Sequence, residues 1–570
     1  MDWLPLWRID GPPVFWSLLD ADGGGAFRLA PGEEHRTRRR YLPRTNILET
    51  RFTTADGVAT VTDGLLLQDG GQLSWIELAR RVRGVRGRVR LRYEVKPRFD
   101  LGRADTTWET RGDVPVARSG SMYLALLIWD AGAPTIRENA AVGEIDLREG
   151  DEALLVCVGV MDEPLPFPPR HEIETRFERT IGAWRRWIDF HRYEGPYEEA
   201  VERSLLALKL LICAPTGAIA AAPTTSLPER IGGDRNYDYR YAWVRDSAFT
   251  LDALGHAGYR EQVHASLAWL LRTTKETHPM LVPAYTLDGG RVPENESLPV
   301  AGYRFSRPAS EGNRACTQRQ LGSYGDFLET IYLYVQHGNA LDAASAERVS
   351  ELVDYVAKSW TKADAGIWEL PQDRQYTVSN INSWAALERA LDLERNGHLS
   401  GDTQKWRTAR DDIRAYVEER CWSERKQSYS FYADTDELDA ALLLAAKVGY
   451  AKGDDPRMHS TIDAIRRELG AGGPLLYRYS GQERQEGAFL ACSFWLVIAL
   501  ARTARKREAR RVMDELVALS NDVGLYAEEI DPESHEQLGN FPQGLTHLSL
   551  IDAAVSLNPG GGRRGRSAGL

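Results

Sequence analysis

The sequence predicts an antiparallel β-sandwich followed by an all-helical domain, and three observations support this. The chain has 570 residues, more than one typical hydrophobic core accommodates. Short alternating or apolar runs fill the first 165 positions, whereas from about residue 196 the hydrophobic period is 3.6 almost without interruption. A proline-rich break separates the two patterns, Glu163-Pro164-Leu165-Pro166-Phe167-Pro168-Pro169.

The first domain is expected to span residues 1–165. Its candidate strands lie between turns such as Asp69-Gly70-Gly71 and Asp130-Ala131-Gly132, and they are Gln72–Val82, Gly87–Lys96, Met122–Trp129 and Glu152–Gly159. Short strands at such regular spacing predict a sandwich. Residues 166–195 follow as a linker that carries a connecting helix over Glu172–Phe190.

Twelve helices are expected in the second domain, residues 196–558. They are 196–213, 246–257, 260–274, 324–338, 343–361, 379–396, 402–420, 435–449, 458–469, 487–505, 508–520 and 543–556. Six antiparallel pairs closed into a toroid fit this pattern, although an open solenoid gives nearly the same one. The lack of a short-period repeat disfavours the solenoid. The Gly/Arg-rich tail, 559–570, is expected to be disordered.

Composition excludes several classes of protein. A hydrophobic fraction of 43% and a charged fraction of 27% are typical of soluble globular proteins. The net charge of −11 argues against a nucleic-acid partner. There is no signal-peptide pattern and no apolar run of about 18 residues, so we expect a cytoplasmic protein without a membrane span. The five cysteines are far apart and lack a C-x-x-C pair, which predicts reduced thiols and no zinc site.

The segment 231–254, IGGDRNYDYRYAWVRDSAFTLDAL, combines charged and aromatic residues in a way that suits a sugar. A pyranose packs its C–H faces on aromatic rings, and its hydroxyl groups take paired donors and acceptors such as Arg with Asp. An ordinary core segment with structural Arg–Asp salt bridges is the alternative, and composition alone does not separate the two.

Two loops between predicted helices carry candidate catalytic carboxyl groups. Glu369 follows Gly366-Ile367-Trp368, and apolar neighbours raise a carboxyl pKa, as a general acid near neutrality requires. Alternatively, Glu369 is an acid stabilised by the dipole of the helix that starts near Ser379. The loop 524–532 holds Glu528, Glu529 and Asp531, one of which could activate a water, but the sequence does not select among them.

Four motifs occur in an order that resembles glycoside hydrolase family 15, the group of inverting glucoamylases and trehalases. They are Trp243-Val244-Arg245-Asp246, Gly366-Ile367-Trp368-Glu369, residues 486–495 (EGAFLACSFW), and Ala527-Glu528-Glu529-Ile530-Asp531 through Asn540-Phe541-Pro542-Gln543. Residues 1–4 and 40–46 also look like pieces of the family's bacterial β-sandwich domain. The resemblance implies an N-terminal antiparallel β super-sandwich followed by an (α/α)6 barrel.

The resemblance also implies roles for particular residues. Glu369 matches the general acid and Glu528 the catalytic base, whereas Glu529 occupies a neighbouring, more variable place. The matches to substrate-binding residues are Tyr239, Trp243, Arg245, Asp246, Trp368 and Arg478. The other charged residues of the first motif are expected to be structural, namely Asp234, Arg235, Asp238 and Arg240.

The function implied is inverting, exo-acting hydrolysis that releases β-glucose from the non-reducing end of malto- or isomalto-oligosaccharides. Trehalose hydrolysis is the alternative, and a catalytically silent toroid used for binding or regulation is disfavoured because both Glu369 and Glu528 are present. Pro371 and Ser379-Asn380 depart from the family pattern beside the acid, which leaves the substrate open. The expected partner is a small sugar, no cofactor or metal is required, and the oligomeric state is left open.

Overall fold

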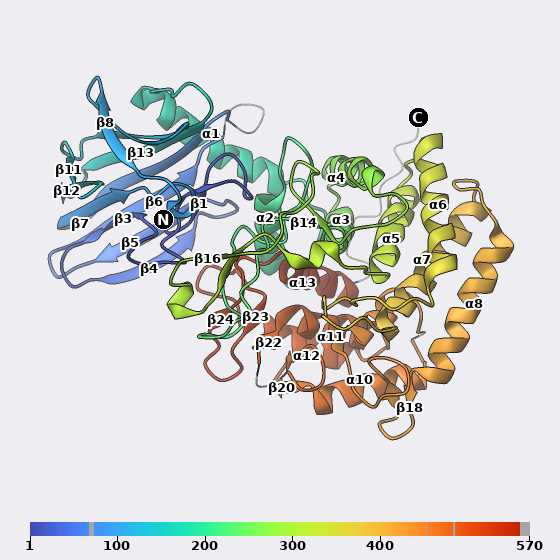
Figure 1. Ribbon diagram of the computed structural model, residues 1–570. Coiled ribbons are helices and arrows are strands. Elements are labelled where there is room, and N and C mark those ends of the chain that lie inside the picture. The colour runs from blue at the N-terminus through green and yellow to red at the C-terminus, as the bar shows by residue number, and fades with distance from the viewer. Residues whose placement is uncertain (68–72, 452, 483–484, 559–570) are drawn as a thin grey trace, which may run out of the picture. The chain divides into compact units, whose positions relative to one another are not determined.

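A computed structural model describes residues 1–67, 73–451, 453–482 and 485–558 (Figure 1). Contacts within the chain divide it into two compact units. The first comprises Met1–Phe190 together with Leu298–Ala309, and the second comprises the rest of the chain from His191. The predicted turn Asp69-Gly70-Gly71 and the predicted disordered tail 559–570 lie outside the described residues.

The first unit is built on an antiparallel sheet of eleven strands. Its main path runs in the order β4-β5-β6-β7-β13-β10-β9-β8, and β3 and β12 also pair with β7. The strands of this unit are β1 Leu4–Pro5, β2 Pro13–Phe15, β3 Ala26–Pro31, β4 Arg36–Tyr41, β5 Leu48–Thr53, β6 Gly57–Leu65, β7 Ile76–Lys96, β8 Thr107–Arg111, β9 Val114–Ser119, β10 Met122–Trp129, β11 Thr135–Arg137, β12 Ala140–Arg148 and β13 Glu152–Met161.

Strand β7 corrects the sequence prediction, which placed two separate strands over 72–82 and 87–96. The structure has one strand, Ile76–Lys96. Its first half pairs with β13 and its second half with β12 and β3. The register against β6 shifts beside Gly84, and Gly87 has a φ of 65°. The glycines therefore mark a bulge inside one strand, where a non-glycine residue would be strained, and not a turn between two strands.

The connecting helix, α1 (Arg170–Ile188), packs within this first unit. Its apolar residues Ile173, Phe177 and Ile188 are buried, as the 3.6-residue period predicts. Arg176 donates twice to the fully buried carboxylate of Glu77, with both bonds 3.0 Å long. A buried carboxylate needs such a partner, so this ion pair ties the helix to β7.

The second unit is helical, and apart from α9 its helices have bounds close to those predicted. Its helices are α2 Glu198–Leu211, α3 Val244–His256, α4 Arg260–Thr273, α5 Gly322–Gln336, α6 Ala343–Ser359, α7 Thr377–Arg395, α8 Thr403–Arg420, α9 Leu444–Lys447, α10 Pro456–Glu468, α11 Leu490–Arg502, α12 Lys506–Val517 and α13 Gly544–Leu557. Short strands lie in its loops: β14 Ala242–Trp243, β15 Ala284–Tyr285, β16 Glu296–Leu298, β17 Ala309–Glu311, β18 Trp422–Ser423, β19 Ser428–Tyr429, β20 Gly470–Gly472, β21 Leu475–Leu476, β22 Ala488–Phe489, β23 Glu529–Ile530 and β24 Gln537–Leu538.

Helix contacts close this unit into a ring. Helix α3 contacts α5, and the chain of contacts continues through α7, α9, α11 and α13, which returns to α3. The intervening helices α2, α4, α6, α8, α10 and α12 pack outside, so six inner helices alternate with six outer ones. Helices α11 and α13 are buried along almost their whole length, as inner helices must be. The ring confirms the predicted toroid over the open solenoid.

The predicted helix over 435–449 is wrong in most of its length. The structure has a 3-10 turn at Ala440–Leu443 followed by the four-residue α9. Upstream, Asp439 forms a β-bridge with Tyr479, and the backbone N–H of Ala440 donates to the carbonyl of Arg478. Backbone groups that a helix needs are thus engaged by the loop that carries Arg478.

Two further findings concern the whole described chain. In the ranges that the structure describes, no helix has both the length and the apolar character needed to cross a bilayer. All five cysteines are free, and three of them, Cys157, Cys421 and Cys492, are buried.

Candidate active site

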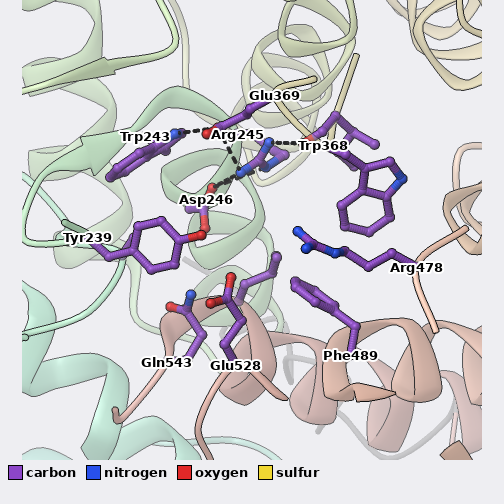
Figure 2. Close-up of a pocket in the computed structure, with 13 residues that line it drawn as sticks. Tyr239, Trp243, Arg245, Asp246, Trp368, Glu369, Arg478, Phe489, Glu528 and Gln543 are labelled. Atoms are coloured by element: carbon purple, nitrogen blue, oxygen red, sulfur yellow. Dashed lines mark hydrogen bonds and ion pairs between the residues drawn. The ribbon is translucent and has the colours of Figure 1, made fainter. Parts of the chain in front are cut away.

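A pocket lies in the helical unit at the starting ends of its inner helices (Figure 2). It encloses about 460 Å³ of space, part of it open to solvent. Its lining is Ala221, Tyr239, Trp243, Arg245, Asp246, Ile367, Trp368, Glu369, Arg478, Phe489, Glu528, Gln543 and Leu545. All eight site residues predicted from the sequence lie in this one pocket.

Three lining residues occupy the position just before an inner helix. Trp243 precedes α3, Phe489 precedes α11 and Gln543 precedes α13, each with an extended backbone. The positive dipole ends of these helices therefore face the pocket region, while the first N–H of each helix already donates to a backbone carbonyl. Such an environment favours the ionised form of a nearby carboxyl group, and it also suits the hydroxyl oxygens of a sugar.

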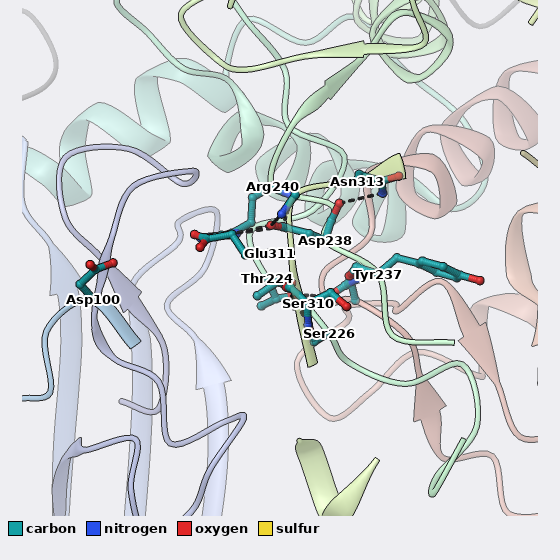
Figure 3. A network of polar contacts seen from close by, with 12 residues as sticks. Asp100, Thr224, Ser226, Tyr237, Asp238, Arg240, Ser310, Glu311 and Asn313 are labelled. Carbon is teal, nitrogen blue, oxygen red and sulfur yellow. Dashed lines mark hydrogen bonds and ion pairs between the residues drawn. The ribbon is translucent and has the colours of Figure 1, made fainter. Parts of the chain in front are cut away.

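The segment that carries Tyr239 and Trp243 is held by a buried polar network (Figure 3). Arg240 donates from Nε and Nη2 to the two carboxylate oxygens of Asp238, at 2.9 and 2.7 Å. Asp238 also accepts from the backbone N–H of Gly312, and its carbonyl accepts from the Asn313 amide. Both charged side chains are almost fully buried, so Asp238 and Arg240 pair with each other and leave the aromatic residues to line the pocket.

The carboxyl group of Glu369 lies against the first motif. The indole N–H of Trp243 donates to Glu369 Oε1 at 2.7 Å, and Arg245 Nη2 lies 3.8 Å from the same oxygen. Burial raises the pKa of Glu369, while Arg245 and the Trp243 hydrogen bond act in the opposite direction. Glu369 does not start a helix, since α7 begins at Thr377. The contacts of its carboxyl group are with Trp243 and Arg245 of the first motif.

The backbone of Glu369 is in the left-handed region, with a φ of 58°. This conformation is costly for a residue with a side chain and persists only where the surroundings impose it. Here the Gln318 amide donates to the Glu369 carbonyl at 3.0 Å, and the N–H of Leu370 donates to the carbonyl of Ala365 at 2.9 Å. These bonds hold the loop so that the Glu369 carboxyl faces the pocket (Figure 2).

Glu528 lies across the pocket from Glu369 (Figure 2). Its side chain is buried, and Tyr239 lines the pocket with it. Burial, followed by the charge of Glu229, raises the pKa of Glu528, whereas Arg478 and Tyr239 lower it. Gly539 leaves room for this side chain, because a Cβ there would lie 2.9 Å from Glu528 Cβ and 3.0 Å from its Oε2.

The neighbouring Glu529 points elsewhere. It begins β23, which lies between β22 and β24 in a three-stranded sheet, and successive side chains of a strand face opposite sides. Its Oε2 accepts from the backbone N–H of Gly487 at 2.8 Å, and it does not line the pocket. The sheet thus separates two adjacent carboxyl groups that the sequence could not tell apart.

Arg478 joins the pocket to a buried carboxylate cluster. It donates to Glu229 Oε2 at 2.9 Å and to Glu486 Oε1 at 2.8 Å, and its Nη2 lies 3.8 Å from Glu529 Oε1. Its guanidinium also lies 5.6 Å from the ring centre of Trp368. Arg478 is therefore held in place from behind by the cluster.

Three groups in the described chain bring enough ligand atoms together to be tested as metal sites. Oxygens of Glu229, Glu486 and Glu529 lie within 4.8 Å of one another, but the Arg478 guanidinium already supplies the cation there. In a second group Lys447 takes the same role, pairing with Asp252 and Asp552 beside His256. The third group, His191, Glu198 and Glu202, is partly exposed and away from the pocket lining.

Sequence reasoning missed two kinds of residue in this region. Glu229 is 249 positions from Arg478, and nothing in its local sequence indicates their contact. Phe489 and Gln543 lie inside motifs that were recognised, but no role was assigned to them. The sequence placed Phe489 inside the predicted helix 487–505 and Gln543 at the start of the predicted helix 543–556, and only the observed helix starts at Leu490 and Gly544 place both directly before a helix at the pocket.

The fold and the pocket together define a carbohydrate-hydrolysing enzyme of the helical-toroid type. The chain belongs to glycosyl hydrolases family 15, whose family model matches residues 195–555.

Individual relatives are similar over nearly the full length. A trehalase of Mycolicibacterium smegmatis is 35% identical, covering 97% of this chain and 87% of its own. A trehalase of Thermoplasma acidophilum is 31% identical, covering 98% and 96%. Among solved structures, a bacterial glucoamylase complexed with acarbose matches with a TM-score of 0.74 at 14% identity, covering 98% of this chain and 91% of that one. At that identity the structural match supports the fold alone, and it agrees with the predicted super-sandwich and (α/α)6 barrel.

Proposed function

We propose that this protein is an inverting α-glucoside hydrolase that acts on α,α-trehalose. The reaction type is supported above all by the placement of two carboxyl groups on opposite sides of one pocket, the partly buried Glu369 and the buried Glu528 (Figure 2). The choice of trehalose is supported by the full-length similarity to the trehalases of Mycolicibacterium smegmatis and Thermoplasma acidophilum. The sequence alone favoured malto- or isomalto-oligosaccharides, and these remain the second candidate.

In the proposed mechanism Glu369 is the general acid. Its pKa is raised by burial, so it retains a proton at a pH at which an exposed glutamate has lost it. It donates this proton to the glycosidic oxygen as the bond to the anomeric carbon breaks. Arg245, 3.8 Å from Glu369 Oε1, then stabilises the carboxylate that forms.

Glu528 is the general base on the opposite face of the sugar. It takes a proton from a water that attacks the anomeric carbon, which is why inversion requires a gap of about 6.5–9.5 Å between the two carboxyl groups. Burial and the charge of Glu229 raise the pKa of Glu528, and Arg478 and Tyr239 act in the opposite direction, toward the ionised form that a base needs. Arg245 Nε donates to Asp246 Oδ2 at 3.1 Å, and this pair binds hydroxyl groups of the terminal glucose. Trp243 and Trp368 pack on the apolar faces of the sugar.

The experiment that tests this function is glucose release from a panel of trehalose, maltose, isomaltose, nigerose and longer maltodextrins. We expect the highest kcat/KM on trehalose. A preference for maltodextrins or isomaltose would replace trehalose by the second candidate, and no activity on any of these sugars would contradict the enzyme proposal.

The stereochemistry of the product is a separate prediction. Because a single displacement inverts the anomeric carbon, the attacked glucose should appear first as the β-anomer. For trehalose, the leaving glucose keeps its α-configuration, so equal amounts of α- and β-glucose should form initially. Proton NMR during early turnover measures the ratio before mutarotation. Two α-glucose molecules per trehalose would contradict inversion.

Replacing Glu229 by Gln should move the acidic limb of the pH–rate profile. Burial raises the pKa of Glu229 itself to about 7, and where Glu229 is ionised its negative charge raises the pKa of Glu528, so its removal lowers that pKa and lets the base ionise at lower pH. We expect the acidic limb of kcat/KM to shift downward by roughly one pH unit. A pH profile of kcat/KM on trehalose measures this shift, and an upward shift would contradict the electrostatic assignment.

A further inference from the structure

Gln543 has a polar atom for which the protein provides no partner. Its side chain is only 2% exposed, and among the described residues its Oε1 atom has no hydrogen-bond donor. A buried amide oxygen without a partner is costly, and in a native structure it calls for an explanation. Since Gln543 lines the pocket, a molecule inside the pocket can provide the missing donor.

The backbone around Gln543 fixes its position. Its N–H donates to the carbonyl of Tyr526 at 3.0 Å, and its own carbonyl accepts from the N–H of His547 at 3.2 Å. Gln543 directly precedes α13. The first N–H of this helix belongs to Gly544 and donates to the carbonyl of Ala221 at 2.8 Å. The side chain is thus presented from a rigid helix start, on the same side of the pocket as Glu528 (Figure 2).

An attacking water has two hydrogens and must direct a lone pair at the anomeric carbon. One hydrogen goes to the base, and if the other is left without an acceptor the water can rotate away from the attacking orientation. A second acceptor beside the base removes this freedom. On this side of the pocket Gln543 Oε1 is a buried acceptor, and no donor among the described residues forms a hydrogen bond with it.

We propose that Gln543 holds the attacking water together with Glu528, an inference that rests on the proposed hydrolytic function. The water donates one hydrogen to Gln543 Oε1 and the other to Glu528. As its oxygen bonds to the anomeric carbon, the proton directed at Glu528 is transferred to that carboxylate, the glycosidic bond breaks, and the leaving oxygen takes the proton of Glu369. The hydrogen on Gln543 remains with the new anomeric hydroxyl.

The test is the full-length Gln543→Met variant, which keeps side-chain length and removes the acceptor. On trehalose we expect kcat to fall by about 10- to 100-fold, with KM changed less than about threefold, because ground-state binding of the sugar does not need the water. The melting temperature should change by less than about 2 °C, since no hydrogen bond within the protein is lost.

α-Glucosyl fluoride separates this role from general acid catalysis. Fluoride leaves with little help from an acid, but water must still attack. The kcat of Gln543→Met should therefore fall on the fluoride as much as on trehalose, whereas Glu369→Gln should retain most of its turnover of the fluoride. Equal kcat for Gln543→Met and the wild type, or a raised KM at unchanged kcat, would overturn the inference.

Gln537→Met is the matched control. Gln537 accepts from the N–H of Ala527 at 2.7 Å and donates to the carbonyl of Leu519 at 2.9 Å. The same substitution there should lower the melting temperature more than Gln543→Met does, while kcat stays within about threefold of the wild type. If Gln543→Met fails to fold, its role is structural and the inference is wrong. A wild-type protein inactive on every α-glucoside would instead contradict the proposed function, so the two failures are distinguishable.

Discussion

Glu369→Gln should lower kcat on trehalose by about 10³-fold, because the amide cannot supply the proton that the leaving sugar needs. The substitution is close to isosteric, and the amide oxygen can still accept the hydrogen bond that Trp243 donates at 2.7 Å. KM should therefore change little. Initial rates of glucose release, measured for both proteins over a range of trehalose concentrations, give the two parameters separately.

Two measurements make the Glu369 result specific. The melting temperature of the variant should be at least that of the wild type, since a buried carboxyl whose pKa is raised by burial is replaced by a neutral group. Turnover of α-glucosyl fluoride should largely persist, because fluoride needs little protonation. Full activity of Glu369→Gln on trehalose would remove Glu369 from the mechanism.

Glu528→Ala should lower kcat by about 10³- to 10⁴-fold on trehalose and also on α-glucosyl fluoride. Both substrates depend on deprotonation of the attacking water, so the better leaving group of the fluoride does not restore kcat. α-Glucosyl fluoride thus distinguishes the two carboxyl groups. The enzyme should still turn it over after loss of the acid, but not after loss of the base. Kinetics on both substrates, with melting temperature as the control for folding, test this.

Glu529→Ala is the comparison that decides which of the adjacent carboxyl groups is the base. Its Oε2 accepts the N–H of Gly487 and its side chain does not line the pocket, so we expect lower stability with substantial remaining kcat. The opposite pattern, an active Glu528→Ala with an inactive Glu529→Ala, would move the base by one position.

The fold class could be predicted because helix periodicity is local information. Helices such as α5, α8 and α13 carry their apolar period within 14 to 18 residues, and their predicted bounds agree within two residues. The prediction failed where distant segments decide the backbone. The bridge between Asp439 and Tyr479 replaces most of the helix predicted over 435–449, and pairing with β12 and β13 keeps β7 continuous through its glycines.

The candidate site was partly predictable because its motifs, like helix periodicity, are local in the sequence. Motifs brought Trp243, Glu369 and Glu528 to notice, and the structure places them in one pocket. The distinction between Glu528 and Glu529 depends on the strand pairing of β23, which three or four residues of sequence do not reveal. The contact of Glu229 with Arg478 spans 249 positions, so it follows from the closed ring and not from any local pattern.

The ring of inner helices has a consequence for how products leave. The pocket lies at the starting ends of inner helices, and two of these, α11 and α13, are buried along almost their whole length, as side chains that fill the axis of a ring would be. From a filled axis we expect that a polysaccharide is not threaded through the ring, and that each catalytic event ends with complete release of the products before the next begins. Both glucose molecules from one trehalose would leave by the route the disaccharide used to enter, and accumulated glucose would compete for that same opening.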